Sequence, residues 1–218
     1  MAERGMRGFA AWLCGRAIVL FARAVTAVRP VWQGIDPGNP RQRVYFANHA
    51  SHGDFILIWT VLPPRQQRMT RPVAGADYWR KGKLRSFIGA DVFNALLIER
   101  TGADAPVSPV DLMAEALDQG SSLIIFPEGT RNQTDMDLLP LKSGLFHLAR
   151  LRPRAELVPV WIENLNRVLP KGALIPVPLM CKVSFGTPLQ VGPDEAKDDF
   201  LIRARAALLA LRPKTEAT

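Results

Sequence analysis

The chain has 218 residues, about the size of one domain with a substantial buried core. Lys and Arg number 28 against 20 Asp and Glu, and the resulting net charge of +8 indicates an anionic partner: nucleic acid, a phosphorylated small molecule or an anionic membrane. The aromatic residues lie inside apolar runs rather than among the Arg and Lys, as stacking platforms would, which argues against nucleic acid.

Residues 6–28 predict a helix rich in apolar residues. A membrane span needs about 20 mainly apolar residues, and each central Arg costs roughly 2.5–3.5 kcal/mol. Arg16 and Arg23 interrupt this run on one helical face, so we expect residues 1–29 to lie in the membrane interface with the Arg side chains among lipid phosphates. A helix packed on the domain is the alternative, because amphipathicity alone does not separate the two.

Residues 30–43 predict a Pro- and Gly-rich connector, and residues 44–47 a buried strand. A polar turn follows, and then an apolar helix that stops at Pro63-Pro64. The next segment is basic, and its charges indicate a solvated face, a lipid surface or an entrance for an anionic substrate. Its cationic residues are Arg65, Arg68, Arg71, Arg80, Lys81, Lys83 and Arg85.

Strands are predicted over 93–98, 122–126, 156–162 and 179–185, and helices over 106–120, from 144 to 150 and from 194 to 211. Pro159 places its strand near a sheet edge or at a bulge. Cys14 and Cys181, far apart in apolar stretches, predict reduced thiols in a cytosolic compartment. Because strands and helices alternate, we expect one α/β domain with a mixed sheet flanked by helices. It spans 30–212, between the N-terminal helix (1–29) and a short tail (213–218).

Between the first strand and its helix lies Asn48-His49-Ala50-Ser51-His52-Gly53-Asp54. A histidine with a nearby carboxylate is the usual proton-transfer pair, because the carboxylate fixes the tautomer and stabilises the imidazolium. The alternative is that His49 caps a turn and Asp54 caps the helix. His52 is assigned to a turn or surface role, and His147, among apolar residues, to packing.

Two further polar clusters follow apolar strands: Glu99-Arg100 and Glu128-Gly129-Thr130-Arg131. Strands that share a sheet bring such ends to one crevice. Arg makes bidentate contacts with phosphate, Gly permits close backbone approach and Thr adds a hydroxyl. The combination predicts a site for a phosphorylated molecule whose hydroxyl is deprotonated. The sequence has no G-x-S-x-G turn and no P-loop, so it does not indicate a serine hydrolase or a common nucleotide site.

Several of these segments, in this order, resemble the sequence blocks of the glycerolipid acyltransferases. Asn48-His49-x4-Asp54 resembles the H-x4-D block, and Phe126 through Arg131 resembles F-P-E-G-T-R. The stretch from Gly89 to Arg100 is similar to G-x-x-x-I-x-R, with a longer gap than usual. Val158-Pro159-Val160 and Phe185-Gly186-Thr187-Pro188 are similar to the later blocks.

The resemblance implies that His49 is the base that activates an acceptor hydroxyl and that Asp54 orients it. It also implies that Arg131, with Gly129 and Thr130, holds the acceptor phosphate. Arg100 is then a second substrate-binding cation, and Glu128 belongs to the same binding turn, organising it rather than moving protons. Weaker expectations for phosphate or membrane contact are Lys81, Lys83 and Lys142.

The function implied is acyl transfer from acyl-CoA or acyl carrier protein to the sn-2 hydroxyl of 1-acylglycerol 3-phosphate, giving phosphatidic acid for phospholipid synthesis. No cofactor and no metal are expected, since the acyl thioester is a co-substrate. The expected partners are a lysophospholipid acceptor, the donor and a membrane, at the cytoplasmic side of the inner membrane. Another lysolipid acceptor, such as a lyso-ornithine lipid, and a catalytically silent lipid-binding protein are the alternatives, with a nucleic-acid binder a distant third.

Overall fold

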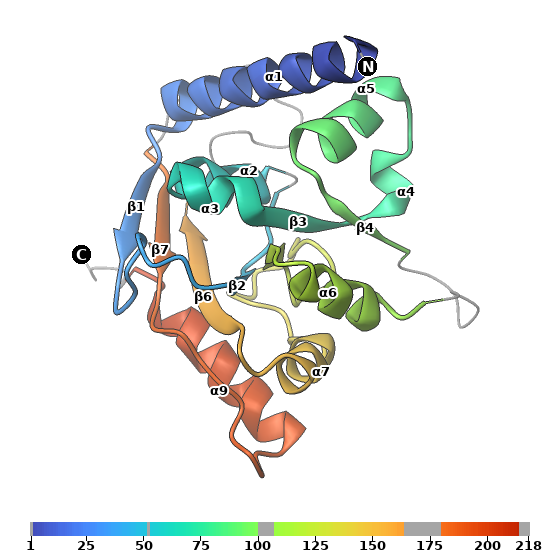
Figure 1. Ribbon diagram of the computed structural model, residues 1–218. Helices are drawn as coiled ribbons and strands as arrows, with labels where there is room; N and C mark the ends of the chain where they lie inside the picture. Colours follow the sequence, from blue (N-terminus) through green and yellow to red (C-terminus); the bar gives the residue numbers. More distant parts are fainter. Residues whose placement is uncertain (1, 52, 100–106, 164–179, 214–218) are drawn as a thin grey trace.

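The computed structural model describes residues 2–51, 53–99, 107–163 and 180–213 (Figure 1). Within them, seven strands form one sheet in the order β1-β7-β6-β2-β5-β3-β4. All neighbours are parallel except β6 and β7, so the sheet is mixed, as the sequence predicted. The strands are β1 (Arg29–Trp32), β2 (Arg43–Ala47), β3 (Thr70–Gly75), β4 (Leu96–Ile98), β5 (Ser122–Ile125), β6 (Glu156–Glu163) and β7 (Lys182–Phe185).

Helices cover both faces of the sheet (Figure 1). They are α1 (Ala2–Thr26), α2 (Asp54–Val61), α3 (Pro64–Met69), α4 (Ala76–Trp79), α5 (Lys83–Ser86), the π-helical η1 (Phe87–Val92), α6 (Pro109–Asp118), α7 (Gly144–Leu151) and α9 (Lys197–Ala210). Residues of α6, α7 and α9 pack in one apolar cluster, while residues of α1, α2 and η1 pack in or against the other. Two covered faces explain why every residue of β2 and β5 is buried, instead of every second one.

The central strand β2 links the two cores. Val44 and Phe46 belong to the cluster under α6 and α7, while Tyr45 and Ala47 belong to the cluster under α1 and α2. All four are fully buried. Since side chains alternate along a strand, a shift of one residue would exchange both sets, and the register that places the following turn is therefore strongly specified.

Two strands were not predicted. Strand β1 pairs with β7 inside the segment expected to be a connector, and β3 lies inside the basic segment. Each carries a proline, Pro30 and Pro72, and neither shows alternation of apolar and polar residues. The strand expected over 93–98 is confined to β4, because η1 continues to Val92 and Asn94 takes a left-handed conformation with φ of 47°.

Pro159 does not mark an edge: β6 lies between β2 and β7. The antiparallel ladder with β7 begins at Val160, so Pro159 lies just outside it, where its carbonyl accepts the N–H of Gly186 at 2.9 Å. An interior strand tolerates the missing N–H at such an interruption. The prolines at 63 and 64 were expected to end a helix; α2 ends at Val61, and Pro64 opens α3 in the first-turn position that proline favours.

Helix α1 lies across the α2 face of the sheet, with one side against the domain (Figure 1). Ala11, Val19 and Ala22 are buried there. Its outward side carries the exposed apolar residues Met6, Phe9, Trp12, Leu13, Leu20 and Phe21. By length and composition, Gly5–Thr26 is one helix apolar enough to cross a membrane.

Arg16 and Arg23, the two arginines that interrupt the apolar run of α1, are both exposed. Arg23 donates to the Thr60 carbonyl of α2 at 3.3 Å, so its guanidinium turns toward the domain. Arg16 lines a groove with residues of α2 and α3. That both side chains lie among lipid phosphates stays a prediction. The outward surface of α1 therefore combines six large apolar side chains with the exposed Arg16 and Arg23.

Candidate active site

The two polar turns that the sequence singled out lie side by side. Strands β2 and β5 are parallel neighbours, with Phe46 opposite Ile125, so their carboxyl ends release residues 48–54 and 126–131 at the same edge of the sheet. The backbone joins them as well, because Asn132 N–H donates to the His49 carbonyl at 2.7 Å. The predicted convergence of these two clusters is present in the structure.

His49 and Asp54 form a hydrogen-bonded pair. His49 Nδ1 lies 2.8 Å from Asp54 Oδ2, and the same oxygen accepts the backbone N–H groups of Ala50 and Ser51 at 2.7 and 2.8 Å. The Asp54 side chain is 2% exposed and that of His49 13%. Three donors on one carboxylate oxygen hold the loop in a tight turn over the start of α2. An Nδ1–H donated to Asp54 leaves Nε2 with its lone pair free to take a proton.

The His49 ring is fixed on its face as well as at its edge. Phe126, the first residue after β5, stacks on the imidazole with ring centroids 4.1 Å apart and an interplanar angle of 18°. Together with the bond to Asp54, this contact restricts rotation about both side-chain torsions. A catalytic base needs such fixed geometry, since small displacements of reacting groups cost large factors in rate.

Glu128 ties the second turn to the first. One carboxylate oxygen accepts the N–H of His49 at 2.7 Å and the other accepts the N–H of Leu139 at 2.9 Å. The side chain is buried, and this burial raises the pKa of Glu128 against the opposing effect of the two backbone donors. Both oxygens of Glu128 are thus engaged inside the protein, and they hold the two turns together.

Asn48, immediately before the histidine, joins the turn to β6. Its side-chain amide donates to the Ile162 carbonyl at 3.1 Å and its carbonyl accepts the Ile162 N–H at 2.8 Å. This pair of bonds imitates one step of a β-ladder beyond the end of β2. The asparagine was quoted within the motif, but its role was not predicted, because the partner is 114 residues away.

The phosphate-binding residues implied by the resemblance lie at the open rim of the site. Gly129 and Thr130 are exposed and Arg131 is half-buried, with no hydrogen bond or ion pair of its side chain to the described residues. Gly129 has φ of +73°, a conformation that glycine favours, and a Cβ there would meet Lys142 Cε at 3.2 Å. Lys142, whose N–H donates to the Pro127 carbonyl at 2.7 Å, is thus brought to the same turn.

Of the other residues that the sequence singled out, those that the structure describes are not found at this turn. Arg100 and His52 lie outside the described residues. Glu99 is exposed at the end of β4, where it pairs with Arg80 at 2.9 Å, and β3 separates β4 from β5. His147 is exposed on α7 rather than packed in the core, so that expectation is wrong. Trp161 of β6 is buried in the core.

The sequence predicted Cys181 as a reduced thiol but did not predict that it lies near the pair. Cys181, immediately before β7, is fully buried in the cluster that contains Phe55 and Val160. Burial, with the negative charges of Asp54 and Glu163, raises the pKa of the Cys181 thiol to about 11. The thiol therefore stays protonated and apolar in character at neutral pH, and it forms part of the wall behind the carboxylate rather than a nucleophile.

Comparison with known proteins agrees with this geometry. Residues 33–163 match the family model described as Acyltransferase. A 1-acyl-sn-glycerol-3-phosphate acyltransferase of Cocos nucifera is 30% identical over 72% of this chain and 49% of its own length, and one of Saccharomyces cerevisiae is 23% identical over 76% and 53%. The chain thus spans about half the length of the curated relatives it matches.

The fold also has a solved counterpart. The 1-acyl-sn-glycerophosphate (LPA) acyltransferase PlsC from Thermotoga maritima superimposes with a TM-score of 0.69, covering 97% of this chain and 88% of that one at 19% identity. At this identity the likeness concerns the fold, and it includes the region of α1 because it extends over nearly the whole chain.

Proposed function

The chain belongs to the acyltransferase family, and on that premise we propose that it transfers an acyl chain from an acyl thioester to the sn-2 hydroxyl of 1-acylglycerol 3-phosphate, giving phosphatidic acid. The single observation that carries the proposal is the His49–Asp54 pair at 2.8 Å, buried on the Asp54 side and bordered by the turn that ends in Arg131. The names of the relatives support the choice of acceptor.

In this reaction His49 Nε2 removes the proton of the acceptor hydroxyl while the oxygen attacks the thioester carbonyl carbon. Asp54 keeps the second ring nitrogen protonated and stabilises the imidazolium that forms. The tetrahedral intermediate then expels the thiolate, which takes up the proton from the imidazolium. With a thiol pKa of about 8.5 the leaving group needs no separate strong acid, and no covalent acyl-enzyme is involved.

The acceptor phosphate is assigned to the rim formed by Gly129, Thr130, Arg131 and Lys142. A half-buried guanidinium with no carboxylate partner among the described residues is well suited to bind a phosphate bidentately. The ammonium of Lys142 adds a second positive charge where its stem lies over Gly129. Arg100 remains a proposal for a further cation.

We assign α1 to the membrane surface, in keeping with a lysophospholipid acceptor. Its outward side has six exposed large apolar residues, which water disfavours and a lipid surface accepts. Attachment of this kind is peripheral or monotopic, and the basic net charge of the chain favours an anionic leaflet such as that on the cytoplasmic side.

The test is an activity matrix on the purified protein. Acyl-CoA and acyl carrier protein donors are combined with 1-acylglycerol 3-phosphate, a lyso-ornithine lipid and a monoacylglycerol, and free thiol is measured. We expect the phosphate-bearing acceptor to give the highest kcat/KM. Preference for the lyso-ornithine lipid would move the protein to that acceptor class, and absence of any turnover with intact lipid binding would support a catalytically silent binder.

A further inference from the structure

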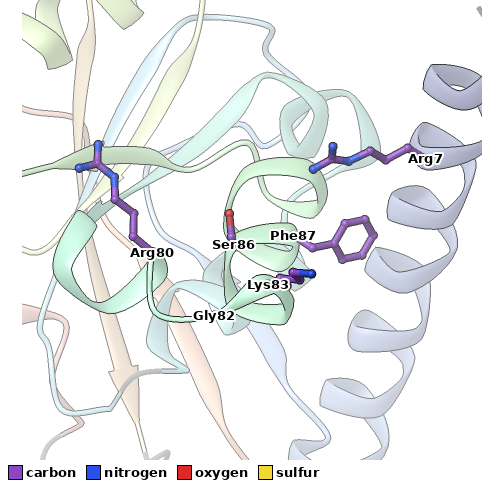
Figure 2. Close-up of a pocket in the computed structure, with 6 residues that line it drawn as sticks. All are labelled: Arg7, Arg80, Gly82, Lys83, Ser86 and Phe87. Carbon is purple, nitrogen blue, oxygen red and sulfur yellow. The ribbon is translucent and has the colours of Figure 1, made fainter.

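A second concave surface lies between α1 and the segment that follows β3. This groove of about 510 Å³ is lined by Arg7, Arg80, Gly82, Lys83, Ser86 and Phe87. Figure 2 shows Arg7 reaching from α1 toward the turns of η1, and the Phe87 ring pointing toward α1. Three of the six lining residues are cationic, so the groove favours an anionic ligand, and Phe87 adds an aromatic surface.

Two of the cations are held in place by carboxylates. Arg7 pairs with Asp91 of η1 at 2.8 Å, and Arg80 pairs with Glu99 at 2.9 Å. Lys83, by contrast, has no ion-pair partner in the part of the chain that the structure describes. The charge of this lysine is therefore uncompensated, and an anion in the groove gains most from Lys83.

The groove is at the same edge of the sheet as the His49–Asp54 pair. Helix α4 begins directly after β3, and β3 is two strand positions from β2, a distance of roughly 10 Å at the usual strand spacing. Trp79, the last residue of α4, packs edge-to-face on Phe55 with ring centroids 5.9 Å apart. Phe55 directly follows Asp54, and Arg80 directly follows Trp79. One aromatic contact thus connects the groove to the site.

We propose that this groove binds the nucleotide portion of coenzyme A as the carrier of the acyl thioester. The inference rests on the proposed acyl transfer and specifies its donor. The phosphates of the nucleotide contact Lys83 and the flanking guanidiniums, and the adenine lies along Phe87. The pantetheine arm then runs past Trp79, which packs on Phe55, to place the thioester beside His49.

Size and lining favour a nucleotide over the other anions. Small-ligand pockets occupy about 300–1,000 Å³, whereas a protein such as an acyl carrier protein needs roughly 800 Å² of surface on each partner. The groove volume falls in the first range. A lipid head group would bring its acyl chains along, yet none of the described exposed apolar side chains of α1 lines the groove.

The experiment compares Lys83→Glu with Arg154→Glu. Both change the charge by the same amount at exposed positions, but Arg154 lies just before β6, at the opposite edge of the sheet. We expect Lys83→Glu to raise the KM for acyl-CoA tenfold or more with kcat retained. The KM for acyl-pantetheine, which lacks the nucleotide, and for the lysolipid should not change, and Arg154→Glu should behave as the wild type.

Equal KM values for acyl-CoA in wild type and Lys83→Glu would overturn the inference, while the proposed acyl transfer would stand. An effect confined to acyl carrier protein donors, or to binding of anionic vesicles, would likewise assign the groove to that partner instead. Calorimetric titration with coenzyme A alone gives a readout that needs no turnover. Binding weakened tenfold in Lys83→Glu supports the inference even if the acyl acceptor proves to be a different lipid, and undiminished binding overturns it.

Discussion

The Glu128 carboxylate accepts the backbone N–H of His49 at 2.7 Å, across 79 residues of sequence. The bond joins the two polar turns that follow β2 and β5, and the second oxygen of Glu128 extends the connection to Leu139. The turn that carries the histidine and the turn that ends in Arg131 therefore form one hydrogen-bonded unit. In our account, Glu128 is a positioning residue: it fixes the base relative to the cations without touching the substrate.

Replacing Glu128 by Gln tests this role. An amide has one oxygen, so it accepts one of the two N–H groups and leaves the other facing its NH2. We expect a loss of about 1–3 kcal/mol in the free energy of unfolding and a lower kcat. Glu115→Gln, the same change at an exposed position of α6, is the control and should alter neither. An unchanged free energy of unfolding in Glu128→Gln would contradict the positioning role of Glu128.

The effect of Glu128→Gln on stability should also depend on pH. Burial raises the pKa of Glu128, so the folded protein retains this proton at pH values where the unfolded chain has lost it. The contribution of Glu128 to stability is therefore complete below the ordinary glutamate pKa and declines as pH rises through the raised value. Denaturant titrations should show the stability difference between wild type and Glu128→Gln shrinking as pH rises above the ordinary glutamate pKa.

Arg131 is expected to bind the phosphate of the acceptor. A charge-assisted hydrogen bond is worth about 1.5–3 kcal/mol, so Arg131→Ala should raise the KM for 1-acylglycerol 3-phosphate roughly ten- to a hundredfold. The rate with a phosphate-free monoacylglycerol should change little, and Arg131→Lys should recover part of the loss. A similar loss with both acceptors would instead place Arg131 in the structure of the turn.

Cys181 should resist modification in the native protein. Its thiol pKa of about 11 exceeds the ordinary value of 9.0, so the thiolate fraction at pH 8 is about a hundredfold lower than in a free cysteine. In a Cys14→Ala variant we expect labelling by a thiol reagent only after denaturation. Between pH 9 and 11 the unfolded chain ionises while the folded one does not, so the free energy of unfolding should fall across this range. Rapid native labelling would contradict this assignment.

The outward side of α1 should determine membrane binding. Phe9 and Trp12, whose rings stack 6.0 Å apart, are 64% and 61% exposed. Changing both to Ser removes apolar area worth about 3 kcal/mol, so sedimentation with anionic vesicles should weaken roughly a hundredfold. Ile202→Ser, at an exposed apolar position on α9, is the matched control. Equal vesicle binding by all three proteins would exclude α1 as the contact.

The sequence predicted the elements whose local pattern agrees with their place in the fold. β2 and β5 are short apolar runs, and the face of α9 with Phe200, Ala204 and Leu208 is buried as its period indicates. Strand β3 was missed because Arg71 and Pro72 break any strand pattern, and it forms only because β5 and β4 pair with it on both sides.

In the candidate active site, too, local features were predicted and features that depend on strand register were not. The His49–Asp54 pair is local in sequence, and its spacing together with the family resemblance predicted it. The bonds of Glu128 to His49 and of Asn48 to Ile162 depend on the register of β2 with its neighbours, and residue spacing does not reveal that register. For the groove around Lys83, the sequence predicted only a basic segment. The groove itself was not predicted, because Arg7 reaches it from a helix more than 70 residues earlier.

The most direct test of the central claim is the rate of acyl transfer from acyl-CoA to 1-acylglycerol 3-phosphate by His49→Ala, measured on protein with native circular dichroism. Loss of a general base costs about 10²–10⁴ in rate, and we predict a fall of that size with little change in either KM. His147→Ala, at an exposed histidine of α7, should retain the full rate. Retention of the wild-type rate by His49→Ala would contradict the account.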